Sequence, residues 1–195
     1  MPRDDRPTLF DEDIRLLLYD YLDLNYPKVR TFEEKIIGKS RSDIVALFPD
    51  AIVGIEIKSD ADTYTRLSGQ VKDYDKYFDM NYIVVGGSHL KHVHEHIPEH
   101  WGILHVDQTE EEPIIREVRS AGKNPKAKLK TQFVFIWKRE LWELLRLNEL
   151  PAYRQKSRKF IIDALLQKVE HGKLKEQMCD LLFERDYSVF ETEEV

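Results

Sequence analysis

The sequence predicts an α/β fold in which a mixed central sheet is flanked by helices and followed by a C-terminal helical extension. Two apolar segments on either side of Pro49-Asp50 predict a β-hairpin, because Pro and Asp favour turns between strands. The run from Tyr82 to Val85 is wholly apolar and is closed by two glycines, which is typical of a buried strand. Apolar residues at helical spacing before, between and after these strands predict the flanking helices.

The elements of the N-terminal half follow one another in a regular order. Residues 10–23 carry apolar side chains at helical spacing and predict a helix that covers the sheet. Extended segments follow at residues 29–37, 43–48 and 52–58. After them come a helix at residues 65–78, strands at 82–85 and 102–106, and a short helix between these two strands.

The C-terminal third is predicted to be helical at residues 136–147, 157–170 and 173–185. The apolar stripes of these helices could wrap the core, close a homodimer interface, or leave basic side chains free to grip DNA, and the sequence does not choose among these uses. We expect a core at residues 1–118, a basic loop at 119–130, and a helical extension at 131–195 that packs on the core. A chain of 195 residues suits one sizeable core.

Two acids and a lysine occupy the outer ends of the predicted hairpin. Asp43 begins its first strand, while Glu56 and Lys58 share one face of its second strand because side chains alternate along a strand. An antiparallel pair brings its outer ends together, so Asp43 is expected within reach of Glu56. Two carboxylates suit Mg²⁺, which would polarise a scissile phosphate and activate a water. Lys58 would orient that water or offset charge on the phosphorus.

The following helix adds a glutamine to this set. Arg66, Gln70 and Tyr74 are spaced four residues apart, which stacks them along one helical face. The polar edge of this helix can then overhang the active face of the hairpin. Gln70 is expected to hold Lys58 or a metal-bound water in place.

Asp43, Glu56-Ile57-Lys58 and Gln70-x-x-x-Tyr74 resemble the motifs of the PD-(D/E)XK nuclease superfamily, in the branch that includes RecB-type and phage-type exonucleases. The resemblance spans roughly residues 28–107 and extends to small single-domain members from bacteria and phages. It implies a restriction-endonuclease-like core and hydrolysis that leaves 5′-phosphate ends. It also implies Mg²⁺, for which Mn²⁺ can substitute, held by Asp43, Glu56 and the carbonyl of Ile57. Arg41, Arg66 and Tyr74 would contact phosphate or support the metal site.

The superfamily usually places a further acid before the hairpin. On the first predicted helix the chain offers Glu12, Asp13 and Asp20, none with a distinguishing context, and Glu34 lies in an extended segment nine residues before Asp43. We expect Glu34 to complete the site. The tripeptide Glu33-Glu34-Lys35 also fits Glu-x-Lys, but it lacks both the upstream aspartate strand and the following glutamine helix.

Charge is distributed unevenly along the chain. Residues 116–175 contain sixteen Lys and Arg against six Asp and Glu, although the whole chain has a net charge of −6. A basic region of this kind can meet a phosphate backbone. Within it, a Gly- and Pro-containing stretch is expected to form a loop that either clamps DNA or is a solvated linker, and it carries Arg119, Lys123, Lys126, Lys128 and Lys130.

Other sequence features exclude several classes of protein. The single cysteine, Cys179, excludes a disulfide framework and fits a reducing cytoplasm. No apolar run resembles a signal peptide or a membrane span, so we expect a cytoplasmic protein.

Six of the seven histidines lie between residues 89 and 105, and His92 and His96 have the spacing of a zinc pair on a helix. No Cys or acid completes a tetrahedral set, so we expect structural or solvated histidines, or ones that tune nucleic-acid binding with pH.

The sequence therefore predicts a metal-dependent nuclease that hydrolyses nucleic acid, with DNA the expected substrate. One alternative is a nucleic-acid-binding or partner-docking module that keeps the fold without useful turnover. Another is a subunit that cuts only when a helicase, phage or defence-system partner presents the substrate. On the simplest alternative, the hairpin acids are only solvated surface residues.

Overall fold

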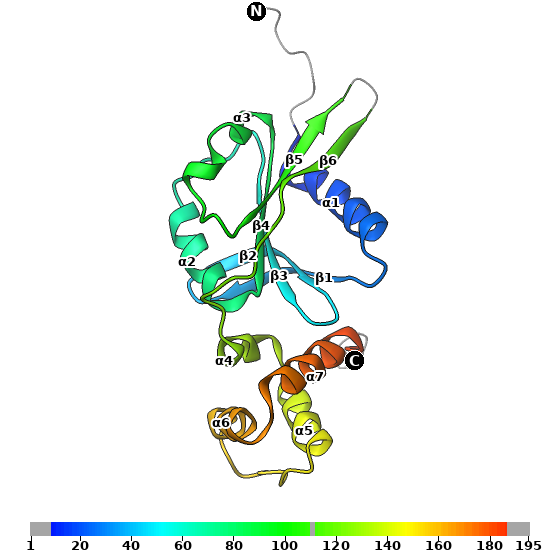
Figure 1. Ribbon diagram of the computed structural model, residues 1–195, viewed down its shortest axis with the longest axis vertical. Helices are drawn as coiled ribbons and strands as arrows, with labels where there is room; N and C mark the ends of the chain where they lie inside the picture. Colours follow the sequence, from blue (N-terminus) through cyan, green and yellow to red (C-terminus); the bar gives the residue numbers. More distant parts are fainter. Residues whose placement is uncertain (1–8, 110–111, 187–195) are drawn as a thin grey trace, which may run out of the picture. The chain divides into compact units, whose positions relative to one another are not determined.

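The computed structural model describes residues 9–109 and 112–186 (Figure 1). Its contacts divide the chain into two compact units, residues 1–127 and residues 128–195. The two units are described separately below.

The first unit is built on a six-stranded mixed sheet with the strand order β1-β2-β3-β4-β5-β6. Strands β1 to β3 pair antiparallel, β3 to β5 pair parallel, and β5 and β6 pair antiparallel. This arrangement, with helices on both faces, confirms the predicted α/β class. The strands are β1 (Arg30–Ile37), β2 (Ser40–Leu47), β3 (Ile52–Lys58), β4 (Met80–Val85), β5 (Gly102–Gln108) and β6 (Pro113–Arg119).

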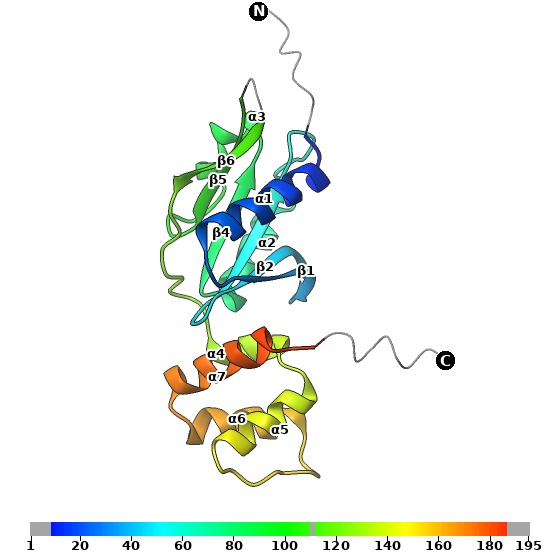
Figure 2. The ribbon, with the colours of Figure 1, turned by 90° about the vertical axis from the view of Figure 1, so that its right-hand side faces the viewer.

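Two helices cover opposite faces of the sheet (Figures 1 and 2). Helix α1 (Asp11–Asn25) buries Ile14, Leu18 and Leu22 in a core with alternate residues of the central strands. Helix α2 (Leu67–Tyr77) lies over the other face, where Phe78 directly follows its last residue. A Cβ atom on Gly54 of β3 would lie 2.2 Å from the Phe78 ring, so only glycine permits this close approach. The polar face of α2 is thereby brought near β3.

The predicted hairpin is present. Phe48 donates its N–H to the carbonyl of Ala51 at 2.8 Å and accepts a bond from the N–H of Ala51 at 3.4 Å, which closes a two-residue turn of Pro49 and Asp50. Such a turn fixes the register of the two strands, with Leu47 opposite Ile52 and Ile44 opposite Ile55. The pairing therefore brings Asp43 to the same end of the hairpin as Glu56.

The elements before and after β5 have only weak signals in the sequence. Helix α3 (Gly87–Leu90) and the 3₁₀ helix η1 (Val93–Glu95) lead into β5. Strand β6 was not predicted, and Arg119 ends this strand instead of beginning a loop. The Arg119 guanidinium donates to the carbonyls of Trp101 at 2.7 Å and Pro98 at 3.1 Å. The basic loop itself spans residues 120–128.

The second unit is helical. It consists of α4 (Leu129–Gln132), η2 (Phe133–Phe135), α5 (Lys138–Leu147), α6 (Arg158–Lys168) and α7 (His171–Phe183), and α5 to α7 match the three predicted helices to within a few residues. Its interior holds a buried ion pair between Arg185 and Glu140 at 2.6 Å, and the Arg185 guanidinium also lies over the Trp137 ring. The packing of this extension on the core stays a prediction. Among the described residues, no helix has the length and apolarity that crossing a membrane requires.

Candidate active site

Asp43 and Glu56 meet where the hairpin ladder stops. The last backbone pair of β2 and β3 at this end joins Ile44 and Ile55. Beyond this pair, the Asp43 side chain replaces a backbone acceptor, because its Oδ2 accepts a hydrogen bond from the backbone N–H of Ile57 at 2.8 Å. One Asp43 oxygen is thus fixed to the strand that carries Glu56, and a shared ion between the two acids stays a prediction.

Glu56 is fully buried and is surrounded by donors. Its Oε1 accepts hydrogen bonds from Lys58 Nζ and Gln70 Nε2, and its Oε2 accepts one from the Tyr74 hydroxyl at 2.7 Å. A buried carboxylate requires such partners, because an isolated charge in the interior is strongly destabilising. Four of the residues predicted for the site, Glu56, Lys58, Gln70 and Tyr74, are therefore in direct contact.

Tyr74 joins the two strands of the hairpin through its hydroxyl. The hydroxyl donates to Glu56 Oε2 and accepts a hydrogen bond from the backbone N–H of Asp43 at 3.2 Å. The side chain is fully buried. Of the two roles expected for Tyr74, contact with phosphate is therefore wrong, and support of the acidic pair is the role that this geometry permits.

The two carboxylates repel each other. Burial, followed by the charge of Glu56, raises the pKa of Asp43 to about 7, and the Ile57 N–H and the Lys58 ammonium offset only part of this rise. A carboxyl group whose pKa is raised by a neighbouring carboxylate has this signature, and a cation between the two groups would relieve it. The electrostatics of the pair therefore favour a bound positive ion.

The donor set fits a hard divalent cation such as Mg²⁺. Two carboxylates on adjacent strands would supply oxygen ligands, and the carbonyl of Ile57 would be the third that the resemblance implies. The Oε1 atom of Gln70 is buried and is without a hydrogen-bond partner in the described part of the chain, so a water held in the site could donate to it. Within residues 9–109 and 112–186, no group of three or more His, Cys, Asp or Glu side chains is placed to hold a metal ion. A site formed by Asp43 and Glu56 would use only two carboxylates.

Arg15 and Asp11 of α1 lie beside Asp43, although neither was predicted for the site. Arg15 donates to the Asp43 carbonyl at 3.1 Å, its Nη2 lies 4.0 Å from Asp43 Oδ1, and its Nε pairs with Asp11. Burial would lower the pKa of Arg15, but the hydrogen bond and charge of Asp11, with the charges of Asp43 and Glu33, raise it. Asp11 also raises the pKa of Asp43. Their spacing of four residues on a predicted helix was the available signal.

Glu34, which was expected to complete the site, is paired elsewhere. It has a positive φ of 50°, and the backbone pairs of β1 and β2 leave out both Glu34 and Asp43, which lie between the pairs Glu33/Ile44 and Lys35/Ser42. Its carboxylate is half-exposed and forms an ion pair with Arg41 at 3.2 Å. The register of β1 and β2 is the same on both sides of Glu34, so this residue stands opposite Asp43 as its place in an extended segment predicted. A role for Glu34 in completing the site stays a prediction, and Asp11 is a second acid near Asp43, whose pKa its charge raises.

The other acids of the first helix do not join the site as ligands in this structure. Asp13 accepts a hydrogen bond from the backbone N–H of Phe10 at 2.9 Å and so caps α1, while Glu12 and Asp20 are exposed. Arg41 and Arg66 are exposed as a phosphate-binding role requires, with Arg66 immediately before α2.

The basic loop is anchored to the first unit. Asn124 is buried and donates to the carbonyls of Asp75 and Phe78 at 2.9 and 2.7 Å, and Lys126 forms an ion pair with buried Asp75 at 2.9 Å. Asp75 also accepts from the imidazole of His100 and the indole of Trp101. Lys130 forms an ion pair with Asp163 at 2.6 Å. Two of the residues expected to clamp DNA, Lys126 and Lys130, are thus held in ion pairs with acids. Lys123 and Lys128 are exposed.

The histidines form separate contacts. His92 pairs with Glu95 at 3.0 Å, His96 stacks on Tyr64, and His100 contacts Asp75. Within the described residues they do not assemble a zinc site.

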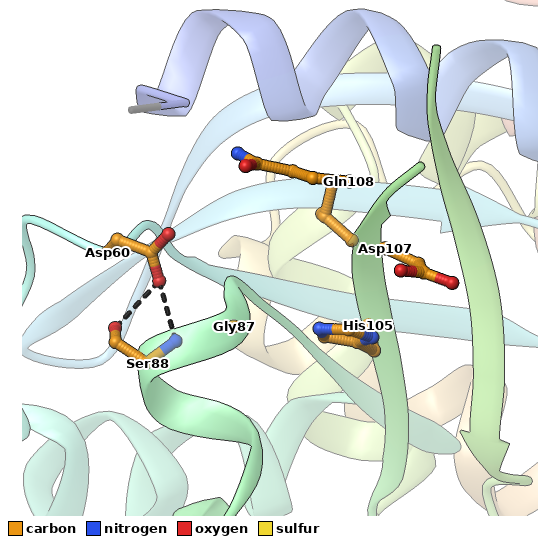
Figure 3. Close-up of a pocket in the computed structure, with 7 residues that line it drawn as sticks. Asp60, Gly87, Ser88, His105, Asp107 and Gln108 are labelled. Atoms are coloured by element: carbon orange, nitrogen blue, oxygen red, sulfur yellow. Dashed lines mark hydrogen bonds between the residues drawn. The ribbon is translucent and has the colours of Figure 1, made fainter. Parts of the chain in front are cut away.

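A polar hollow lies at the same edge of the sheet, beyond the end of β3. It has a volume of about 530 Å³, and Asp60 and Ser88 face the strand that carries His105 and Gln108 across it (Figure 3). Asp60 accepts bonds from the N–H and hydroxyl of Ser88, and the buried Nε2 of His105 is unpartnered among the described residues. In open α/β sheets, ligands bind at the carboxyl ends of parallel strands. The position of the hollow follows that rule.

Comparisons with known proteins add a family. A family model described as Bacteriophage P4 protein cII matches residues 9–192. Among solved structures, SfsA from Pyrococcus furiosus in complex with Ca²⁺ is 13% identical, with a TM-score of 0.35, over 60% of this chain and 63% of that one. The chain thus spans less than two thirds of SfsA. A search of curated proteins found no match.

Proposed function

We propose that this chain, which belongs to the bacteriophage P4 protein cII family, is a metal-dependent nuclease that hydrolyses phosphodiester bonds in nucleic acid, with DNA as its substrate, and leaves 5′-phosphate ends. The observation that carries the proposal is the meeting of Asp43 and Glu56 at the end of one hairpin, with Lys58 on the buried carboxylate. The resemblance to PD-(D/E)XK nucleases supports the same assignment.

Asp43, Glu56 and the Ile57 carbonyl would hold Mg²⁺, and Mn²⁺ would substitute. When bound, the ion would neutralise the acidic pair, polarise the scissile phosphate and make a nearby water more acidic. Gln70 would orient the attacking water through its unpartnered Oε1. Lys58 would offset the negative charge that develops on the phosphorus, since its compact ammonium suits a point of charge better than a planar guanidinium does.

Tyr74 is a positioning residue in this proposal. It holds Glu56 and the backbone of Asp43 in one geometry from a fully buried position. Arg41 and Arg66 are exposed and would contact the phosphates that flank the cleaved bond. Lys123 and Lys128 would extend that contact along the backbone.

The test is cleavage by the full chain. Labelled single- and double-stranded DNA and RNA would be incubated with wild-type protein in Mg²⁺, in Mn²⁺ and in EDTA. We expect cleavage of DNA only with metal, and products whose ends accept a new 5′ label only after phosphatase treatment. Lys58→Ala should slow cleavage about 10²–10³-fold, the usual effect of removing a group that stabilises transition-state charge.

Lys72→Ala is the matched control, because Lys72 is an exposed lysine on α2. It should cleave at the wild-type rate. Thermal unfolding of both variants separates loss of catalysis from loss of folding. Unchanged cleavage in Lys58→Ala would indicate a contaminating nuclease, and nucleic-acid binding with no metal-dependent cleavage on any substrate would favour the non-cutting binding module.

A further inference from the structure

The second unit carries a pocket that none of the roles above uses. It has a volume of about 500 Å³ and is lined by Lys138 and Trp142 of α5 and by Ala152 and Arg154. The last two residues lie in the loop that joins α5 to α6, whose course Figure 1 shows. Trp142 is 41% exposed, an unusual state for the largest apolar side chain. The Lys138 ammonium lies 5.4 Å from the centre of its ring.

We propose that this pocket binds single-stranded nucleic acid, with a base stacked on Trp142 and backbone phosphates held by Lys138 and Arg154. Proteins that bind single strands without sequence preference combine exposed aromatic faces with a basic groove. The described residues that line the pocket include two cations, one aromatic ring and no acid. A duplex would fit poorly, because its bases are already stacked on each other.

A second aromatic ring with a lysine close to it is linked to the pocket through the loop between α5 and α6. Phe160 is 43% exposed, and the Lys156 ammonium lies 5.3 Å from its ring centre. Phe160 packs edge-on against Tyr153 at 5.2 Å, and Tyr153 lies in the chain between the two loop residues of the pocket. The loop thus links the pocket to a second stacking face, as a strand of several nucleotides would need.

The local charge also favours a polyanion. Residues 138–160 contain seven Lys and Arg against three Glu. Of these acids, Glu140 is buried against Arg185 and Glu143 is paired with Arg146 at 2.5 Å. An apolar partner helix would leave the flanking cations desolvated, and an acidic peptide would gain little from two exposed rings. Nucleic acid uses both features.

This inference extends the proposed function but does not depend on it, because binding can be measured without hydrolysis. The full chain would be titrated in EDTA against a fluorescein-labelled 20-residue oligothymidylate at low salt, with anisotropy as the readout. Trp142→Ala should weaken binding roughly 5- to 150-fold, the range expected for loss of one stacked base. Leu147→Ala is the matched control, since Leu147 is also 41% exposed on α5, and it should bind as wild type.

Substituting both Lys138 and Arg154 with Gln should weaken binding further and reduce its dependence on salt concentration. Binding of Trp142→Ala within twofold of wild type would overturn the proposal. So would a duplex of the same length that competes better than the unlabelled single strand. Competition by polyglutamate equal to that of the single strand would instead assign the pocket to an acidic peptide. None of these outcomes would affect a cleavage activity measured with metal.

Discussion

Replacing Asp43 with Asn removes one negative charge from the acidic pair and keeps the shape of the side chain. The Asn oxygen can still accept the hydrogen bond from the N–H of Ile57, which Asp43 receives at 2.8 Å. The substitution therefore isolates the charge of the site from its structure. We expect Asp43→Asn to be more stable than the wild-type protein when no metal is present.

The magnitude follows from the pKa of Asp43, which burial and Glu56 raise from 3.8 to about 7. Since the folded state binds the proton more tightly, its stability falls as pH rises above 3.8 and the loss is complete above pH 7. At 1.36 kcal/mol per pKa unit, the full loss is about 4 kcal/mol. At pH 5 less than about 2 kcal/mol of it has developed. Asn removes this loss, so its advantage should be largest at pH 8.

The assay is urea unfolding followed by circular dichroism, at pH 5 and pH 8, in EDTA and in Mg²⁺. In EDTA at pH 8 we expect Asp43→Asn to gain about 2–4 kcal/mol in free energy of unfolding. Mg²⁺ at a hundredfold excess over its dissociation constant should stabilise the wild type by about 2.7 kcal/mol and leave the variant unchanged. Asp50 is an exposed acid in the turn of the same hairpin, so Asp50→Asn is the control. It should change neither the free energy of unfolding in EDTA nor the stabilisation by Mg²⁺.

Two results would refute the reasoning. Asp43→Asn could be less stable than wild type in EDTA at pH 8, which would mean that Arg15, 4.0 Å from Asp43 Oδ1, holds the ionised carboxylate favourably. Alternatively, the variant could gain the same free energy at both pH values, which would show that its effect does not come from titration of Asp43.

Three further outcomes are expected. Tyr74→Phe removes the hydroxyl that links the two hairpin strands, so it should lower stability by about 1–3 kcal/mol and lower kcat with little change in substrate affinity; a change confined to KM would contradict this. Gly54→Ala would place a Cβ 2.2 Å from the Phe78 ring and should destabilise by about 1–3 kcal/mol or more in urea unfolding, and a neutral effect would show that α2 can shift away. Arg185→Ala leaves the buried Glu140 without its cation and with the Trp137 N–H as a remaining partner, so calorimetry should show a loss of about 3–5 kcal/mol, and a loss below 1 kcal/mol would show that water reaches that carboxylate.

The hairpin and its acids could be predicted because each depends on local rules. Pro49-Asp50 fixes the turn, and alternation along the strands then determines which side chains share a face. The spacing of Gln70 and Tyr74 on one helical face adds a second local rule, and both side chains reach Glu56. These contacts follow because the turn and the helical spacing each fix which side chains share a face.

The contribution of α1 could not be predicted in the same way. Arg15 reaches the Asp43 carbonyl across 28 positions of the sequence, and no local pattern indicates which turn of the helix faces β2. The positive φ of Glu34, 50°, could not be predicted either, because it lies within a strand that looks regular in the sequence. The strand β6 was missed because its burial pattern is only partly alternating, with mostly exposed or half-buried residues.

The Asp43 side chain extends the sheet's hydrogen bonding with Oδ2, and under the proposed function Oδ1 would bind the metal, so structure and catalysis would depend on different atoms of one residue. A single base change converts an Asp codon into an Asn codon, and the amide would keep the bond to Ile57. If the proposed nuclease activity holds, a lineage would lose cleavage in one step without losing the fold. Under the same proposal, a family member that binds nucleic acid without cutting it is expected to keep this backbone with Asn at this position.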